Sequence, residues 1–199
     1  MSRVLIACEF SGIVREAFKA KGHDAWSCDL LPTEIPGQHI QGDVLEHLED
    51  GWDMMIAFPP CTHLSKAGGA HWKKPEKKRL QWEALKFVHL LMDAPIERIA
   101  IENPIGAINT RIRKPDQRIQ PYQFGHSWTK ETCLWLKNLP VLKSTNIVKP
   151  TGNWVKPGNW RPHRKFNDVP EGGNGNWKDR SRMFKGIALA MASQWGGKG

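Results

Sequence analysis

Short apolar runs alternate with segments of helical periodicity along the first half of the chain. The apolar runs cover residues 4–8, 25–28, 53–58 and 98–101. Between them, residues 13–18 and 80–92 carry apolar side chains at helical spacing. Strands that alternate with helices in this way are typical of α/β proteins with a parallel sheet. We therefore expect an α/β fold built on one mostly parallel sheet.

The second half of the chain adds two predicted elements and one irregular segment. Residues 133–136 are predicted to form a later strand. Residues 181–195 are predicted to form a closing helix, because Ile187, Met191 and Trp195 fall on one stripe of it. Residues 143–178 are rich in Gly, Asn, Pro, Trp and basic residues, and we call them the basic arm. A chain of 199 residues suffices for one core, so residues 1–199 are expected to form a single domain that includes the arm.

The overall charge points to a polyanionic partner. The formal net charge is +9 and the isoelectric point is near 9.5. Lysine and arginine clusters gain affinity by displacing counterions from phosphates, so a nucleic acid is expected, although charge does not distinguish DNA from RNA. Charge and composition leave the oligomeric state open.

Cysteine usage and hydropathy indicate the compartment. The four cysteines stand singly without CxxC spacing, which fits free thiols in a reducing environment. No apolar run is long enough to span a bilayer, and no apolar signal segment precedes the first charged residues. We expect a cytoplasmic protein with no membrane partner, and no metal site is predicted.

Two chemically reactive side chains follow apolar runs. Cys61 stands behind Pro59 and Pro60, just after residues 53–58, and the prolines restrict the backbone that carries the thiol. Glu102 follows the apolar run Ile-Ala-Ile, where a carboxylate is costly to bury unless it is paired or used. Strand ends of a parallel sheet converge on one crevice, so a nucleophile and an acid are expected to meet there. The alternatives are a structural buried cysteine and a carboxylate that pairs with an arginine.

The first strand leads into a turn with one glycine. Residues 9–12, Glu-Phe-Ser-Gly, precede the first predicted helix, and Asp29 stands at the end of the next strand. An acid at this distance suits the ribose hydroxyls of a nucleoside cofactor. The turn lacks the GxGxxG pattern of a pyrophosphate site, which argues against a dinucleotide and leaves S-adenosylmethionine compatible. Asp43 could approach the adenine, although an Asp after Gly is more often a turn residue.

The basic arm combines ring faces with cations. Trp154, Trp160, Arg161, Arg164 and Lys165 offer surfaces for stacking on bases and charges for phosphates. The alternative is a loop that its tryptophans fold back onto the core.

Several short motifs follow one another in a recognisable order. Residues 8–12 read Cys-Glu-Phe-Ser-Gly, residues 42–44 read Gly-Asp-Val, residues 60–61 read Pro-Cys and residues 102–103 read Glu-Asn. Together with Asp29, and more loosely with Arg182 and Gly186 near the C-terminus, they resemble the motifs of the cytosine-C5 DNA methyltransferases. The resemblance covers most of positions 4–104 and the last predicted helix.

The resemblance implies a fold, a cofactor and a site. The implied fold is the Rossmann-like fold of S-adenosylmethionine-dependent methyltransferases, with a mostly parallel sheet and helices on both faces. The implied cofactor, S-adenosylmethionine, would contact Glu9, Phe10, Ser11, Gly12, Asp29, Leu30, Asp43, Val44 and Pro59. Cys61 and Glu102 would be catalytic, and Pro60 and Asn103 would contact the substrate.

The implied reaction is methylation of cytosine in DNA through a covalent adduct. The Cys61 thiolate would add to C6 while Glu102 hydrogen-bonds or protonates N3, so that C5 takes the methyl group. Loss of the C5 proton and of Cys61 would release 5-methylcytosine. In a duplex the target base must first leave the stack, at a cost of a few kcal/mol.

The chain departs from the family pattern at several points. Thr62 stands where the family has Gln, and Pro104 stands where it has Val. A clear Gln-x-Arg-x-Arg motif is missing, and Arg111, Arg113 and Arg118 are candidates to substitute for it in binding the substrate. Only the basic arm is left to serve as a target-recognition region. This reduced region, together with residues 129–135, Thr-Lys-Glu-Thr-Cys-Leu-Trp, resembles small phage or prophage members.

Three alternatives remain beside this hypothesis. The same chemistry could act on single-stranded nucleic acid or on a cytosine nucleotide. A non-catalytic nucleic-acid-binding module on a methyltransferase scaffold would keep the basic arm and lose the reaction. A zinc-dependent deaminase would use His47 and Glu49 with Cys61, but Leu64 stands where a second cysteine is required.

Overall fold

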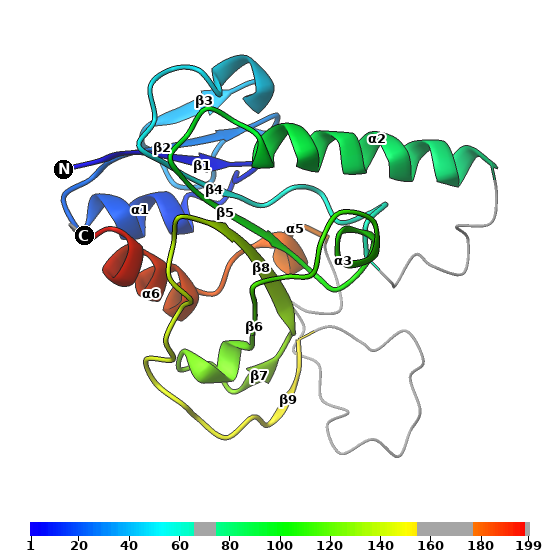
Figure 1. Cartoon of the computed structure of the whole chain (residues 1–199). Helices are drawn as coiled ribbons and strands as arrows, with labels where there is room; N and C mark the ends of the chain where they lie inside the picture. Colours follow the sequence, from blue (N-terminus) through cyan, green and yellow to red (C-terminus); the bar gives the residue numbers. More distant parts are fainter. Residues whose placement is uncertain (66–74, 155–176, 198–199) are drawn as a thin grey trace.

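A seven-stranded sheet forms the middle of the molecule (Figure 1). The computed structural model describes residues 1–65, 75–154 and 177–197. The strands of the sheet are β1 (Arg3–Ala7), β2 (Asp24–Asp29), β3 (His39–Gln41), β4 (Met54–Ala57), β5 (Arg98–Asn103), β6 (Gln117–Ile119) and β8 (Thr132–Lys137). Their order is β3-β2-β1-β4-β5-β8-β6. Neighbours pair in parallel except β8, which runs antiparallel to β5 and β6. The expectation of a mostly parallel sheet is confirmed.

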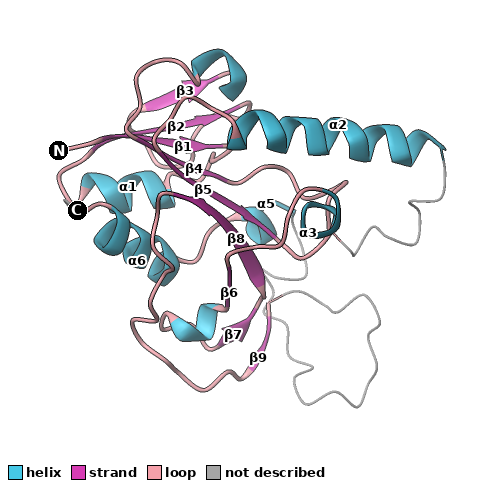
Figure 2. Cartoon of the chain, viewed as in Figure 1, coloured by secondary structure: helices cyan, strands magenta, loops and turns pink. Residues whose placement is uncertain are grey.

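Helices cover both faces of this sheet (Figure 2). Helices α1 (Ile13–Lys19) and α6 (Lys185–Trp195) pack together on one face. Helices α2 (Pro75–Met92) and α3 (Ala107–Arg111) pack on the other. The mostly parallel sheet with helices on both faces confirms the expected Rossmann-like methyltransferase fold. None of the described helices is long and apolar enough to cross a bilayer.

Smaller elements lie beyond the sheet. Strands β7 (Trp128–Thr129) and β9 (Gly152–Asn153) pair in parallel as a separate two-stranded sheet. Short 3-10 helices cover Val44–His47 (η1) and Pro121–Gln123 (η3). Helix α5 (Trp177–Ser181) precedes α6.

The central strands are apolar on both sides because both faces are covered. In β1, Val4 and Ile6 belong to the hydrophobic cluster of α1 and α6, whereas Leu5 and Ala7 belong to that of α2 and α3. Successive side chains of a strand point to opposite faces, so one continuous apolar run supplies both clusters. This explains why the strands read as uninterrupted apolar runs in the sequence.

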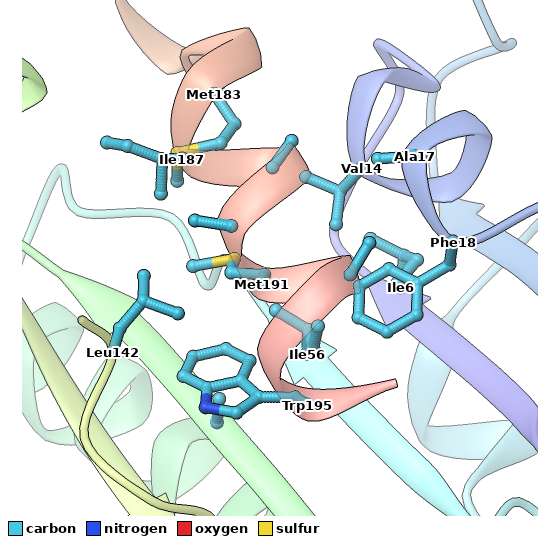
Figure 3. Close-up of a cluster of buried hydrophobic side chains, with 14 of the residues drawn as sticks. Ile6, Val14, Ala17, Phe18, Ile56, Leu142, Met183, Ile187, Met191 and Trp195 are labelled. Carbon is cyan, nitrogen blue, oxygen red and sulfur yellow. The ribbon is translucent and has the colours of Figure 1, made fainter. Parts of the chain in front are cut away.

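The face under α6 is closed by large side chains (Figure 3). Met191 and Trp195 of α6 gather with Val14 and Phe18 of α1 and with Ile6 of β1. The indole of Trp195 is fully buried, and its Nε1 donates to the carbonyl of Pro140 at 2.9 Å. The indole therefore fills the core without leaving its polar atom unsatisfied.

The elements differ from the sequence-based expectation in some boundaries. The closing helix does not run from 181 to 195, because α5 ends at Ser181 and α6 begins at Lys185. Phe184 has extended backbone angles and serves as the N-cap of α6, so the helix cannot continue through it. Strands β3 and β6 and helix α3 were not predicted, since elements of three to five residues show no measurable periodicity. Most of the basic arm, residues 155–176, lies outside the described residues.

Gly186 allows α6 to approach the η3 segment closely. A Cβ atom built on this residue would overlap the backbone carbonyl of Phe124 and lie 3.0 Å from Nε2 of His126. The backbone N–H of Gly186 also donates to that Nε2 at 2.9 Å. The glycine is needed because two backbone segments meet there, and no positive φ is involved.

We expect Gly186→Ala to lower the free energy of unfolding by about 1–3 kcal/mol, because the added methyl group must displace backbone. Urea denaturation followed by far-UV circular dichroism measures this loss. Gly197→Ala is the matched control, since a Cβ there meets no atom within 4 Å. Equal stability of the two variants would contradict the close approach.

Candidate active site

Adjacent parallel strands end at one edge of the sheet. Ala7 of β1 pairs with Ala57 of β4, and Ala57 pairs with Ile101 of β5. Strands β1 and β4 end at this pair, and β5 continues to Asn103 at the same edge of the sheet. The residues at these strand ends meet at the carboxyl edge, where open α/β sheets bind ligands. Cys61 follows β4, and Glu102 lies at the end of β5. The structure thus brings the two predicted catalytic residues to the same edge.

Two adjoining cavities lie at this edge. The Asp43 cavity, named after one of its lining residues, has a volume of about 380 Å³, and the Cys61 cavity has about 440 Å³. Both volumes are within the range of small-molecule sites. Cys8, Asp29, Leu30 and Pro60 line both cavities, so the two share part of their walls.

The turn after β1 is held by a buried carboxylate. Glu9 is only 5% exposed, and its Oε1 accepts hydrogen bonds from the backbone N–H of Val14 at 2.8 Å and from Ser11 Oγ at 2.9 Å. Burial raises the pKa of Glu9, while these hydrogen bonds oppose the rise. Gly12 follows with φ of 76°, the left-handed region that favours glycine. Glu9 therefore satisfies the first N–H groups of α1 and fixes the shape of the turn.

The predicted cofactor residues are distributed over both cavities. Glu9, Phe10 and Ser11 line the Cys61 cavity, whereas Asp43 and Val44 line the Asp43 cavity. Gly12 and Pro59 line neither cavity. Gly12 instead allows the left-handed backbone of the turn, and the carbonyl of Pro59 accepts a hydrogen bond from Asn103.

The Asp43 cavity is lined by apolar side chains and by the carboxylates Asp29, Asp43 and Glu83. Asp29 ends β2, and its Oδ1 accepts from the backbone N–H of Leu31 at 2.9 Å. Burial raises the pKa of Asp29. Asp43 is the N-cap of η1 and accepts from the backbone N–H of Leu45 at 3.0 Å. Val44 and Phe87 supply apolar lining, so the cavity offers acceptors for hydroxyl and amino groups beside an apolar wall.

The loop that carries Cys61 is fixed to the end of β5. The side chain of Asn103 is buried, and its Nδ2 donates to the carbonyl of Pro59 at 2.7 Å. After Cys61 the chain turns, since the carbonyl of Cys61 accepts from the N–H groups of Leu64 at 3.0 Å and Ser65 at 2.9 Å. Cys61 itself is exposed. The loop therefore presents an accessible thiol at a defined position.

Glu102 lies near the end of β5 and lines neither of the two cavities. Its Oε1 accepts a short hydrogen bond from Thr132 Oγ1, on the neighbouring strand β8. Burial raises the pKa of Glu102, and Lys130 and the Thr132 hydroxyl oppose the rise. Part of the Glu102 population is therefore neutral at a higher pH than for a free carboxyl group, and a neutral carboxyl can donate a hydrogen bond.

The thiol of Cys61 experiences opposing charges. Desolvation and the neighbouring Glu102 raise its pKa, whereas Lys130 and, more weakly, Arg180 lower it. The net direction is upward, so the resting thiol is protonated more than a free cysteine would be. A reactive thiolate forms at this position only if Lys130 and Arg180 outweigh the effects of desolvation and of Glu102 on the pKa.

Lys130, Thr132 and Arg180 were not assigned to the site from the sequence. Thr132 is the first residue of β8, Lys130 lies two residues before it, and Arg180 lies in α5. In the sequence, residues 129–135 stood out only by their resemblance to small phage or prophage members. That resemblance did not indicate where these residues lie in the fold. The antiparallel pairing of β8 with β5 brings its start beside the end of β5, which a periodicity argument does not reveal.

The predicted substrate arginines do not converge on the cavities. Arg113 forms an ion pair with Asp116 at 2.7 Å and donates to the carbonyl of Leu136. Arg118 lies 3.7 Å from Glu131 in a second ion pair. Arg111 ends α3. None of the three arginines lines the Asp43 cavity or the Cys61 cavity, so their role stays a prediction.

The tryptophans of the basic arm are only partly described. Trp154 is half-buried, and its ring meets Phe184 with a centroid distance of 4.9 Å and Trp128 with one of 5.9 Å. Trp154 therefore packs on the core, in agreement with the alternative expectation that the tryptophans of the arm fold it back onto the core. The other predicted arm contacts, Trp160, Arg161, Arg164 and Lys165, lie outside the described residues.

Within residues 1–65, 75–154 and 177–197, no group of three or more His, Cys, Asp or Glu side chains is arranged to hold a metal ion. His47, singled out with Glu49 as a deaminase-like pair, contacts Asp50 through Nδ1 at 2.9 Å.

Comparison with known proteins yields a distant structural likeness. No family model matches the chain, and no curated protein matches it in sequence. A solved structure of a DNMT2 mutant from Spodoptera frugiperda is similar, with a TM-score of 0.43 and 15% sequence identity. The match covers 75% of this chain and 55% of that one, so the chain spans about half the length of its structural neighbour. A likeness this remote carries no conclusion about activity.

We expect Asn103→Ala to lower the free energy of unfolding by about 1–3 kcal/mol, because the carbonyl of Pro59 loses its buried donor. Thermal and urea denaturation measure the loss. Asn109→Ala, on helix α3, is the control. A variant as stable as the wild type would show that Asn103 does not hold the loop.

The raised pKa of Glu102 predicts that the stability of the folded protein depends on pH. The unfolded carboxyl group ionises near its ordinary value of 4.5, whereas the folded one keeps its proton to a higher pH. Stability that is present below the unfolded pKa is therefore lost as pH rises through the folded pKa, by at most about 1.4 kcal/mol per pH unit. Glu102→Gln should lack this loss, so its stability relative to the wild type should increase from pH 4 to pH 8 in urea titrations. Glu97→Gln, exposed just before β5, should show no such trend.

Proposed function

We propose that this chain is an S-adenosylmethionine-dependent methyltransferase that methylates C5 of cytosine in DNA through a covalent Cys61 adduct. One observation carries the proposal. An accessible thiol and a carboxyl group with a raised pKa lie near the ends of adjacent parallel strands, beside a second cavity lined by Asp29, Asp43 and Glu83. Nucleophilic catalysis on a pyrimidine needs both groups within reach of one ring.

The lining of the Asp43 cavity fits a nucleoside cofactor. Asp29 and Asp43 offer carboxylate acceptors for ribose hydroxyls and an amino group, and Val44 and Phe87 offer an apolar wall for a base. Phe10 and Leu30 extend this lining toward the Cys61 cavity. When bound, S-adenosylmethionine would supply an electrophilic methyl group.

The chain's own residues activate the cytosine ring. The Cys61 thiolate adds to C6, and the electron pair of the C5–C6 double bond moves toward C5. Glu102 in its neutral form donates a hydrogen bond to N3 and withdraws electron density as the bond forms. Once C5 carries its new substituent, the C5 proton leaves to a solvent base, the double bond reforms and Cys61 departs as thiolate. The thiol and the carboxyl group thus both return to their starting states.

The net charge of the chain bears on the kind of substrate that it binds. A formal charge of +9 favours phosphate-rich substrates. A cytosine within a duplex would have to be extruded to reach a thiol on the sheet edge. Single-stranded nucleic acid and cytosine nucleotides avoid that cost, so they belong in every assay beside duplex DNA.

A non-catalytic nucleic-acid-binding module is the second candidate. The observation in its favour is the net upward pKa shift of Cys61, which is the direction found for unreactive cysteines. Such a module has no need for a cofactor, so cofactor binding separates the two candidates.

We expect tritium from S-adenosylmethionine to appear in 5-methylcytosine when the protein is incubated with duplex DNA, single-stranded DNA, RNA or dCMP and the nucleosides are analysed. Cys61→Ala should lower the transfer rate by roughly 1,000-fold or more, because the nucleophile is lost. Cys133→Ala, buried in β8, should retain transfer and serves as the matched control.

Three outcomes contradict parts of the proposal. Transfer that survives Cys61→Ala would exclude this nucleophile. Cofactor binding by equilibrium dialysis without label on any of the four substrates would exclude the reaction. Absence of both binding and label would favour the binding module.

A further inference from the structure

Lys130 is held against Arg180, a residue that lines the Cys61 cavity. It follows β7 and precedes β8, and its Nζ donates to the backbone carbonyl of Arg180 at 2.6 Å. Its ammonium group also lies 5.9 Å from the centroid of the Phe184 ring. The backbone N–H of Lys130 donates to Gln120 Oε1 at 2.9 Å. Both ends of the residue are thus fixed, and Arg180, to which the side chain is tied, lines the same cavity as Cys61.

The groups that act on Cys61 come from three elements. Glu102 acts from β5, Lys130 from the segment before β8, and Arg180 from α5. Lys130 lowers the pKa of the thiol more than Arg180 does. Burial lowers the pKa of Lys130 itself, whereas Glu102 and Cys61 both raise it. Lys130 is therefore coupled to the predicted nucleophile and to the predicted acid at the same time.

The proposed reaction needs a specific charge distribution among these groups. The thiol must lose its proton while the carboxyl group keeps one, and two adjacent negative charges in a desolvated site are unfavourable. A fixed positive charge nearby stabilises one negative charge in such a site, but not two. The hydroxyl of Thr132 already donates a hydrogen bond to Oε1 of Glu102, so that oxygen does not need Lys130 as a donor.

We propose that the Lys130 ammonium is the counter-charge of the Cys61 thiolate, which lets the thiolate form beside a protonated Glu102. Lys130 acts through Cys61 and is a positioning residue in this sense. Its catalytic consequence rests on the proposed function, but the charge coupling does not. Arg111, Arg113 and Arg118 do not line the Cys61 cavity. Lys130 does not line it either, but its ammonium group is bound to Arg180, which does, so the proposed cation comes from a different segment than the sequence indicated.

The test measures alkylation of Cys61 by iodoacetamide between pH 6 and pH 11, with the protein alone and with peptide mass spectrometry to assign the site. Lys130→Gln keeps a hydrogen-bond donor and removes the charge. It should raise the midpoint of the alkylation profile by about one pH unit, which corresponds to roughly tenfold slower reaction below the midpoint. Lys130→Arg keeps the charge and should restore the wild-type midpoint.

Lys137→Met is the matched control. Lys137 lies at the other end of β8, and its Nζ also donates to a backbone carbonyl, that of Ala94 at 3.1 Å. This variant should leave the midpoint unchanged. Lys130→Met repeats the measurement if Lys130→Gln fails to fold, with folding checked by near-UV circular dichroism.

An unchanged midpoint in Lys130→Gln would overturn the proposal. A shift of equal size in Lys130→Arg would also overturn it, because the effect would then come from shape and not from charge. No DNA or cofactor is present, so failure of the methyl-transfer assay and failure of this coupling are separate results.

Discussion

The level register of the central parallel strands is the constraint on which the site depends. Ala7, Ala57 and Ile101 are paired across three strands, so the backbone hydrogen bonds of the sheet decide where the chain leaves each strand. The thiol of Cys61 and the carboxyl group of Glu102 are separated by 40 residues in sequence, yet they lie at one edge of the sheet because their strands are parallel neighbours. A shift of one strand by a single residue would turn its side chains to the opposite face and separate the two groups.

The antiparallel strand β8 contributes what the parallel strands cannot. A parallel neighbour of β5 would place another strand end at this edge, whereas β8 places its start there. Thr132 and the preceding Lys130 thereby join residues that lie about 30 positions earlier in the chain. The acid is thus supported by a hydroxyl group and a cation that belong to one short segment.

The sequence was sufficient for the main strands, the parallel sheet and the meeting of Cys61 with Glu102, because those follow from apolar runs and from their order. It was insufficient for Lys130 and for Arg15, whose fully buried guanidinium donates to Ser27 Oγ at 2.9 Å and pairs with Glu16. Arginine on a helix is normally solvated, and only the tertiary fold shows this one enclosed. The same holds for the strands of three residues, whose existence depends on neighbours and not on local pattern.

Helix α6 covers the same face of the sheet as α1, although it is the last helix described. Arg182, just before it, forms an ion pair with Glu34 at 2.6 Å, across 148 positions of sequence. During synthesis, Val14 and Phe18 therefore remain uncovered until α6 has been made. A nascent chain arrested before α6 would expose an apolar sheet face to chaperones and proteases.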